Sequence, residues 1–247
     1  MNIKEVLEYG EDKLKHIDSA TLDAELLLSY TINKEKEYIY TYPYKEISKK
    51  NLNKYIKLLK KRAKYIPLAY LLEYKEFYGL KFKVNKHVLV PRPLTEALVD
   101  KAYEVIKDSN IKNIVEIGTG SGAIIIALVH KLGKESKNFN FYATDISNKA
   151  LKVAKYNAKE NKVKKYITFK KGNLLKPVKH IKIDLLLTNL PYLNKDDMKE
   201  LSISKEPKTA LLEKDHYKKF FKQTKKYLTK VPIIIFEDKK GITTQNL

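Results

Sequence analysis

A glycine-rich turn between two apolar stretches is the feature that most limits the fold of this chain. Residues 115–117 lead into Gly118-Thr119-Gly120-Ser121-Gly122, and an apolar stretch of helical length follows. Glycine lets the backbone turn tightly and approach a ligand closely. The first N–H groups of the following helix then face that ligand. A strand, a turn and a helix in this order indicate an α/β fold with a ligand site at the turn.

The chain from residue 113 onward alternates between strand-like and helix-like stretches. The strand-like runs are 113–117, 139–144, 166–169, 183–188 and 231–236. The helix-like stretches are 121–132, 147–160 and 214–228. This alternation predicts a mostly parallel, Rossmann-like sheet with helices on both faces.

Two further segments precede the α/β part. Residues 1–74 carry apolar side chains at helical spacing and no catalytic motif, which predicts a small N-terminal helical bundle. Residues 75–92 contain two short apolar runs that predict a hairpin linker, followed by a helix from about 95 with Thr95 as its cap. The expected domains are therefore 1–74, 75–92 and 93–247.

The net charge of +21 suggests a nucleic-acid partner at first sight. However, Arg62 and Arg92 are the only arginines among the 50 basic residues. A surface that binds phosphate is expected to use arginine as well as lysine, because the guanidinium group binds phosphate with two hydrogen bonds. We therefore interpret the charge as a compositional bias and expect no specific nucleic-acid partner.

The composition also excludes several classes of site. The chain has no cysteine, which excludes disulfide scaffolds, Cys-ligated zinc, iron–sulfur clusters and thiol nucleophiles. The five histidines are scattered without metal-binding spacing, so no metal site is expected. No apolar run approaches the roughly 18 residues of a membrane span, and we expect a cytoplasmic protein without membrane contact.

The glycine spacing and two later residues predict a cofactor site. The pattern G-x-G-x-G is more typical of enzymes that use S-adenosylmethionine (SAM) than of dinucleotide enzymes, whose third glycine comes one residue later. Asp145, at the end of the second strand, can accept hydrogen bonds from ribose hydroxyls of either cofactor. Asn173, with Leu174 beside it, can contact adenine after the third strand, although asparagine is equally a common turn residue.

The segment Asn189-Leu190-Pro191-Tyr192 follows the fourth strand, where α/β sheets bind their substrates. It suits methylation of a planar NH2 group, whose nitrogen is a poor nucleophile. The Asn189 side-chain oxygen and the Leu190 carbonyl can accept hydrogen bonds from the two N–H groups and so orient the nitrogen lone pair. Tyr192 can pack against the planar group.

Longer segments resemble one family, the HemK/PrmC methyltransferases. They are Asp23–Leu28, Pro67–Tyr70 with Phe77–Gly79, Glu206–Leu211 and, most specifically, Pro91-Arg92-Pro93-Leu94-Thr95-Glu96, which is similar to the family signature P-R-P-x-T-E. The resemblance implies SAM-dependent methylation of a glutamine side-chain amide in peptide chain release factors, with the N-terminal bundle contacting the release factor and the enzyme acting as a monomer.

The resemblance also implies individual roles. The turn Gly118, Thr119, Gly120, Ser121 and Gly122, with Glu116 before it, would hold the methionine part of SAM. Asp145 would hold the ribose, and Asn173 and Leu174 would lie beside the adenine. Asn189 to Tyr192 would clamp the substrate glutamine, with Asn189 also beside the cofactor. Arg92, Thr95 and Glu96 would brace the rim.

Two departures from the family pattern stand out. Leu190 occupies a position where the family usually has proline, which removes some rigidity from the catalytic segment. After the run 231–236, the chain has fewer residues than the usual helix and antiparallel hairpin require. We therefore expect a C-terminally shortened sheet without its hairpin, in which the Ile-rich last strand is an open edge unless another segment covers it.

Two other functions remain open from the sequence. Ribosomal RNA adenine dimethyltransferases also carry Asn-Leu-Pro-Tyr, but they start closer to the glycine turn and lack the P-R-P-x-T-E signature. A non-catalytic protein of the same fold would explain the departures from the family pattern, such as Leu190, and the short C-terminal part.

Overall fold

The computed structural model describes residues 1–192, 203–212, 215–228 and 233–246. The chain forms two compact units, of which the first holds Met1–Glu73 and the second holds most of the remaining residues. The expected start of the last helix at 214 and of the last strand at 231–232 lies outside the described residues.

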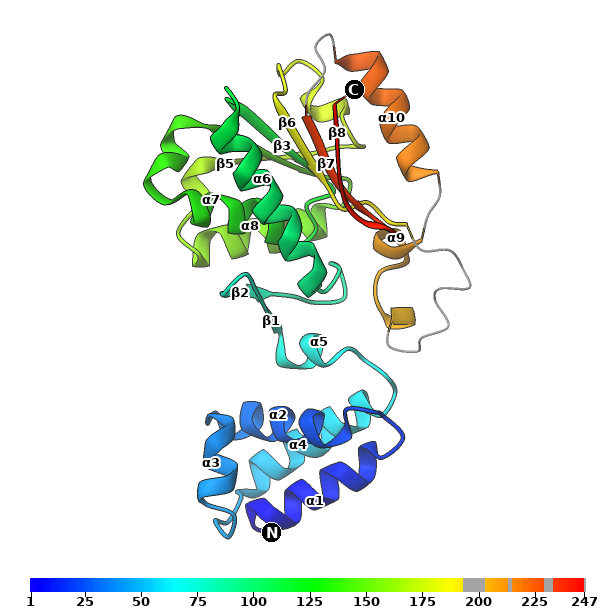
Figure 1. Ribbon diagram of the computed structural model, residues 1–247. Helices are drawn as coiled ribbons and strands as arrows, with labels where there is room; N and C mark the ends of the chain where they lie inside the picture. Colours follow the sequence, from blue (N-terminus) through cyan, green and yellow to red (C-terminus); the bar gives the residue numbers. More distant parts are fainter. Residues whose placement is uncertain (193–202, 213–214, 229–232, 247) are drawn as a thin grey trace. The chain divides into compact units, whose positions relative to one another are not determined.

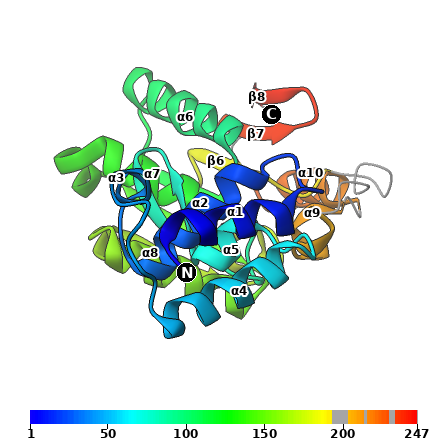
Figure 2. The same cartoon turned by 90° about the horizontal axis from the view of Figure 1, so that it is seen from below.

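The first unit is helical. Its helices are α1 (Ile3–Leu14), α2 (Ala20–Ile32), α3 (Lys36–Thr41), α4 (Lys49–Arg62) and α5 (Leu68–Leu72). Helices α1, α2 and α4 pack against one another (Figure 2). Gly10 of α1 allows this approach, because a Cβ there would lie 1.9 Å from the hydroxyl of Tyr55, a buried residue of α4.

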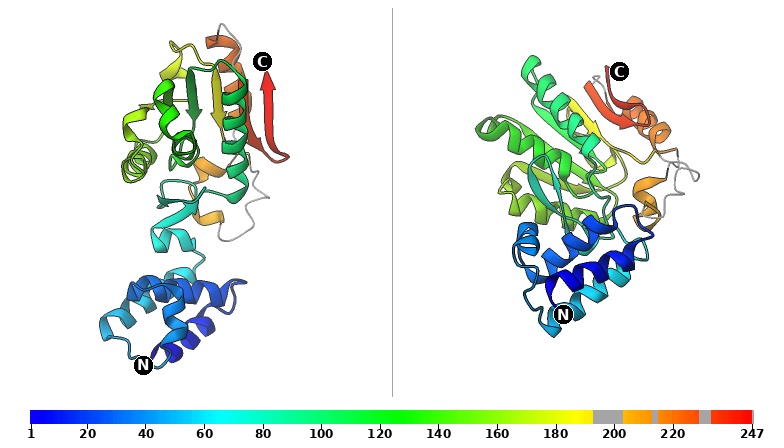
Figure 3. Two further views of the ribbon diagram at one scale, coloured as in Figure 1. Left: turned by 60° about the vertical axis from the view of Figure 1, so that its left-hand side comes forward. Right: turned by 60° about the horizontal axis from the view of Figure 1, so that its bottom comes forward.

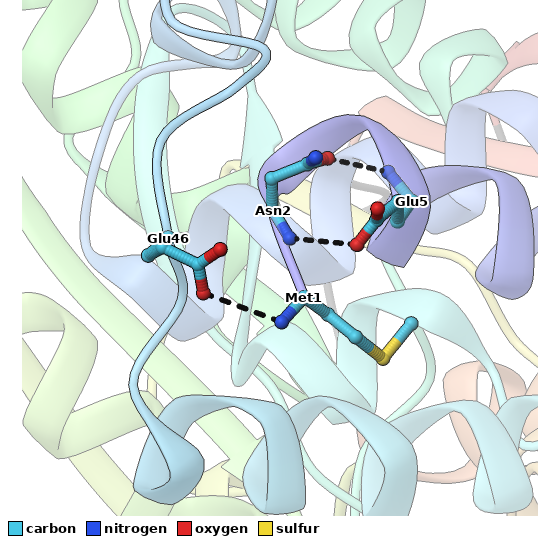
Figure 4. Close-up of polar contacts among 4 residues, drawn as sticks. All are labelled: Met1, Asn2, Glu5 and Glu46. Atoms are coloured by element: carbon cyan, nitrogen blue, oxygen red, sulfur yellow. Dashed lines mark hydrogen bonds and ion pairs between the residues drawn. The ribbon is translucent and has the colours of Figure 1, made fainter.

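A capping box fixes the start of α1. The Asn2 side chain accepts a hydrogen bond from the Glu5 backbone N–H at 3.0 Å, and the Glu5 carboxylate accepts one from the Asn2 backbone N–H at 3.0 Å (Figure 4). The N-terminal amine of Met1 lies 3.3 Å from the Glu46 carboxylate. These bonds satisfy helix N–H groups that have no partner within the helix.

The second unit contains a β-hairpin and a six-stranded sheet (Figure 1). The hairpin pairs β1 (Tyr74–Phe77) with β2 (Leu80–Lys83). The sheet has the order β5-β4-β3-β6-β7-β8. Its strands are β3 (Asn113–Ile117), β4 (Asn140–Asp145), β5 (Ile167–Lys171), β6 (Leu185–Thr188), β7 (Ile233–Asp238) and β8 (Gly241–Asn246). All neighbouring strands run parallel except β7 and β8, so the expected α/β fold with a mostly parallel sheet is confirmed.

Helices cover both faces of this sheet. The helices of the second unit are α6 (Glu96–Asp108), α7 (Ala123–Leu132), α8 (Asn148–Glu160), α9 (Lys208–Leu211) and α10 (His216–Tyr227), with 3₁₀ turns at Pro93–Thr95, Gly133–Asn138, Lys164–Tyr166 and Lys176–Val178. A further 3₁₀ turn, Ile203–Lys205, groups with the first unit. Strand alternation divides the core in two. Leu185 and Leu187 of β6 join a cluster with α6 and α7, whereas Leu186 joins a second cluster with Phe220 of α10.

The expectation that the sheet lacks its C-terminal hairpin is wrong, and the Ile-rich strand is covered by another segment of the chain. Strand β8 pairs antiparallel with β7 from Ile233 to Asp238, and together they form a hairpin (Figure 3). Gly241 has a φ of 114°, a conformation that favours glycine, at the start of β8. The last described residues therefore supply the cover that the expected shortened sheet would lack, and the edge strand is β8, whose sequence is mostly polar.

Candidate active site

A pocket lies at the carboxyl ends of the central parallel strands. Ile117 of β3 is in register with Thr144 of β4 and Thr188 of β6, so the segments that follow these three strands meet at one edge. Of the residues expected in the site, the pocket is lined by Glu116, Gly118, Thr119, Gly120, Ser121, Asp145, Asn173, Leu174, Asn189, Leu190 and Pro191. The expected site residues Gly122 and Tyr192 do not line it.

The glycine turn after β3 needs its glycines for different reasons. Gly118, Gly120 and Gly122 have φ values of 73°, 55° and 82°, which favour glycine over residues with a side chain. The backbone N–H groups of Gly118 and Thr119 both donate to the Thr144 carbonyl at 2.9 Å. A Cβ on Gly122 would lie 2.8 Å from a side-chain atom of Ile126, so this glycine permits close packing of α7 and does not face the pocket.

Glu116 is a buried acid at the base of this turn. Its side chain is 1% exposed and accepts a hydrogen bond from the Thr119 hydroxyl at 2.5 Å. Burial raises the pKa of Glu116 to about 8, against the opposing effect of the Thr119 hydrogen bond. The carboxyl group therefore holds its proton at neutral pH in the ligand-free protein.

Asp145 connects the end of β4 to the glycine turn. Its Oδ2 accepts from the Gly120 N–H at 3.0 Å, and its Oδ1 accepts from the Ser147 N–H at 2.8 Å. Burial raises the pKa of Asp145, while these backbone hydrogen bonds act in the opposite direction. Each carboxylate oxygen can accept more than one hydrogen bond, so Asp145 can still bind hydroxyl groups of a ligand.

The segment after β5 is tied to the same edge. The Gly172 N–H donates to the Asp145 carbonyl at 3.0 Å, and a Cβ on Gly172 would lie 2.8 Å from Pro177. Leu174 adopts a positive φ of 50° and lines the pocket beside Asn173. The pocket therefore has an apolar and an amide side chain where a planar ring can lie.

The segment after β6 contacts two other parts of the chain. The Asn189 side-chain Nδ2 donates to Thr95 Oγ1 at 3.2 Å and to Glu237 Oε2 at 3.0 Å. The Tyr192 hydroxyl donates to Glu237 Oε1 at 2.9 Å. Burial, together with the charge and the hydrogen bond of Glu237, raises the pKa of Tyr192 to about 12.

Two buried carboxylates of this region, Glu237 and Glu206, were not predicted as site residues. Glu237, at the end of β7, is 1% exposed, and its position at the end of an Ile-rich run resembles that of Asp145 after β4. Glu206 accepts hydrogen bonds from Arg92 and, at 2.9 Å, from the Val90 N–H. The expected capping bond of Thr95 is absent because its hydroxyl donates to Glu237 at 2.6 Å.

Among the described residues, no group of three or more His, Asp or Glu side chains could hold a metal ion. In the part of the chain that the structure describes, no helix is long and apolar enough to cross a membrane.

Comparisons with known proteins agree with this geometry. Two family models match the chain: the PrmC N-terminal domain over residues 5–72 and the methyltransferase small domain over residues 95–230. Among solved structures, the hMettl16 catalytic domain in complex with MAT2A 3′UTR hairpin 6 matches with a TM-score of 0.50 and 21% identity. The match covers 74% of this chain and 69% of that chain, and it supports the fold alone.

Curated relatives are more similar in sequence. The release factor glutamine methyltransferase of Dictyoglomus turgidum is 41% identical, with 85% of this chain and 74% of the relative covered. The protein of the same name from Borreliella burgdorferi is 36% identical over 96% of this chain and 82% of the relative. With both family models matched in chain order and relatives this similar over most of their length, the chain belongs to the release factor glutamine methyltransferase family.

Proposed function

We propose that this protein transfers a methyl group from SAM to the side-chain amide nitrogen, N5, of a glutamine in a peptide chain release factor. The observation that carries the proposal is the orientation of Asn189, whose Nδ2 faces Thr95 and Glu237. This orientation leaves the side-chain oxygen Oδ1 to accept a hydrogen bond from a substrate NH2 group. The names of the relatives support the choice of substrate.

The residues at the pocket fit SAM. The glycine turn has no side chain at Gly118 or Gly120, so a ligand can approach the backbone there. Asp145 offers carboxylate oxygens to ribose hydroxyls, and Asn173 and Leu174 offer a surface for adenine. SAM supplies an electrophilic methyl group on its sulfonium.

The chain's own contribution is to orient the amide. An amide nitrogen is a poor nucleophile because its lone pair is delocalised into the carbonyl group. Asn189 Oδ1 and the Leu190 carbonyl accept hydrogen bonds from its two N–H groups, which fixes the direction of the lone pair and stabilises positive charge as it develops. Formation of the new N–C bond would break the methyl–sulfur bond of the cofactor, leave it as a neutral thioether and release one amide proton to solvent. Tyr192, which does not line the pocket, is held through its hydroxyl by Glu237, the residue that also holds Asn189.

The proposal extends to the rest of the chain. Residues 1–74 would recognise the release factor, 75–92 would link the two parts, and 93–247 would carry out the transfer. We further propose that the enzyme acts as a monomer in the cytoplasm, where translation terminates, without a specific nucleic-acid partner or membrane contact.

Methyl transfer to a purified release factor tests this function directly. The full chain is incubated with labelled SAM and either a release factor, the same factor with its target glutamine replaced by alanine, or ribosomal RNA. We expect label only in the first sample. Label in RNA alone would support an adenine methyltransferase, and a folded protein that neither binds SAM nor transfers label would be a non-catalytic relative.

A matched pair of variants then tests the site. Asn189→Ala should lower transfer by about 10²- to 10³-fold, because one acceptor for the substrate amide is lost. SAM affinity, measured by calorimetry, should change less than about threefold. Asn138→Ala, at an exposed position of the same unit, should retain wild-type transfer. Full activity of Asn189→Ala would refute the proposed role of the amide.

A further inference from the structure

Three side-chain donors from distant parts of the chain converge on the Glu237 carboxylate. Oε2 accepts from the Thr95 hydroxyl at 2.6 Å and from Asn189 Nδ2 at 3.0 Å, and Oε1 accepts from the Tyr192 hydroxyl at 2.9 Å. Glu237 itself is 1% exposed. A buried carboxylate with three donors is held firmly in place, and it holds each donor in return.

The protons of this cluster determine which way the Asn189 amide points. The Thr95 hydroxyl has a single proton, which it donates to Glu237. Its oxygen can therefore only accept from Asn189, at 3.2 Å. Asn189 faces two acceptors on this side, so the NH2 end of its amide must lie there. A flipped amide would place Oδ1 against the Glu237 carboxylate oxygen. Both atoms are hydrogen-bond acceptors, so no hydrogen bond could form between them.

We infer that Glu237 is a positioning residue for methyl transfer: its carboxylate, with Thr95, fixes the Asn189 amide so that Oδ1 is presented to the substrate amide, and it anchors the Tyr192 ring. The inference rests on the proposed function for the identity of the substrate. The orientation of Asn189 itself follows from the hydrogen bonds alone.

Glu237 acts through its neighbours because it does not line the pocket. Its backbone is fixed as well as its side chain. The carbonyl oxygen of Glu237 accepts a hydrogen bond from the hydroxyl of Tyr217 on α10, and its strand is in the middle of the β6-β7-β8 portion of the sheet. A rigid strand end therefore supports the loop that follows β6, across a separation of 48 residues in sequence between Glu237 and Asn189.

Glu237→Gln is the most informative variant because it keeps the shape and removes one acceptor. The glutamine oxygen can accept hydrogen bonds either from Thr95 and Asn189 or from Tyr192. The NH2 group that replaces the other oxygen cannot accept a hydrogen bond, so the remaining donor or donors lose their partner. We expect kcat to fall by about 10²-fold, in the range found when a transition-state hydrogen bond is lost, with SAM affinity within about threefold of wild type. Asp238→Asn, which removes the same charge one position later in β7, should retain wild-type kcat.

A double-mutant cycle separates positioning from a general loss of structure. Thr95→Val removes the hydroxyl of the same cluster, and Thr95→Ser, which keeps it, should restore activity. If Glu237 and Thr95 act together on Asn189, the double variant Thr95→Val with Glu237→Gln should be about as active as Glu237→Gln alone. Losses that multiply would overturn the inference, as would a wild-type kcat for Glu237→Gln. Thr95→Val also tests the cluster if Glu237→Gln does not fold.

A spectroscopic measurement keeps this result independent of the substrate. The side-chain amide signal of Asn189 in an ¹⁵N-labelled protein is assigned by its loss in Asn189→Ala. It should shift in Glu237→Gln and stay unchanged in Asp238→Asn. If the Asn189 signal shifts in Glu237→Gln but the wild-type protein methylates no release factor, the proposed function is refuted and the positioning of Asn189 by Glu237 stands. An unchanged Asn189 signal in Glu237→Gln would refute the positioning role.

Discussion

Replacement of Glu116 by glutamine should remove a large pH dependence from the stability of the protein. Burial raises the pKa of Glu116 from 4.5 to about 8, so the folded state binds a proton more tightly than the unfolded state. Stability from this group is fully present below about pH 4.5 and is lost as the pH rises toward 8. Linkage with these two pKa values gives a loss of about 3 to 4 kcal/mol between pH 5 and pH 8.

The difference between variant and wild type isolates this contribution. Glutamine resembles the protonated acid and can still accept the hydrogen bond from Thr119, but it does not titrate. Urea unfolding of both proteins from pH 5 to pH 8 gives the difference in the free energy of unfolding at each pH. The free energy of unfolding of Glu116→Gln, relative to that of wild type, should increase by about 3 to 4 kcal/mol from pH 5 to pH 8. Glu160→Gln, at an exposed position, should show a constant difference. A constant difference for Glu116→Gln would refute the assignment of a raised pKa to this buried acid.

Three further predictions concern the cofactor site and the packing of each unit. Asp145→Ala should weaken SAM binding by about 10- to 100-fold in calorimetry, because one or two hydrogen bonds to a charged group are lost. Gly122→Ala should lower the free energy of unfolding by about 1 to 3 kcal/mol more than Gly133→Ala in urea titrations, because only the first new Cβ meets a neighbour within 4 Å. Arg62→Leu should destabilise the helical unit by about 3 to 5 kcal/mol in thermal unfolding, because it leaves the Asp23 carboxylate, now 2.5 Å from Arg62, buried and unpaired.

The parts of the fold that the sequence predicted well are those with a strong local pattern. The run 113–117 is β3 as expected, and the stretch 147–160 is α8 from Asn148 to Glu160. Strand β8 was not predicted because the segment from Gly241 contains mainly polar residues and has no alternating pattern. Its pairing with β7 depends on a turn at Gly241 and on an unpaired neighbouring strand, and neither is visible in a short window of sequence.

The same distinction applies to the site. The place of the glycine turn at the pocket could be predicted because the turn is a run of consecutive residues, and that of Asp145 because it follows an apolar strand. The hydrogen bond between Glu237 and Thr95 could not be predicted, because the two residues lie 142 positions apart in sequence. The hydroxyl of Thr95 was assigned to a helix cap, the local role that such a residue usually has. Only the folded chain shows that the Thr95 hydroxyl donates its hydrogen bond to a buried carboxylate instead.

Leu190 shows how residues 189–192 can be restrained without the proline that the family usually has at position 190. The Leu190 side chain is 5% exposed and joins the core cluster on the α10 side of the sheet. One of its methyl carbons, Cδ2, would lie 3.4 Å from a Cβ at Gly118, so it packs over the glycine turn. Proline restricts the backbone through its ring. Here the backbone at position 190 is restricted by tertiary contacts instead: the Leu190 side chain is buried, and Glu237 accepts hydrogen bonds from Asn189 before it and Tyr192 after it. Leu190 therefore connects the segment after β6 to the glycine turn after β3 through direct packing.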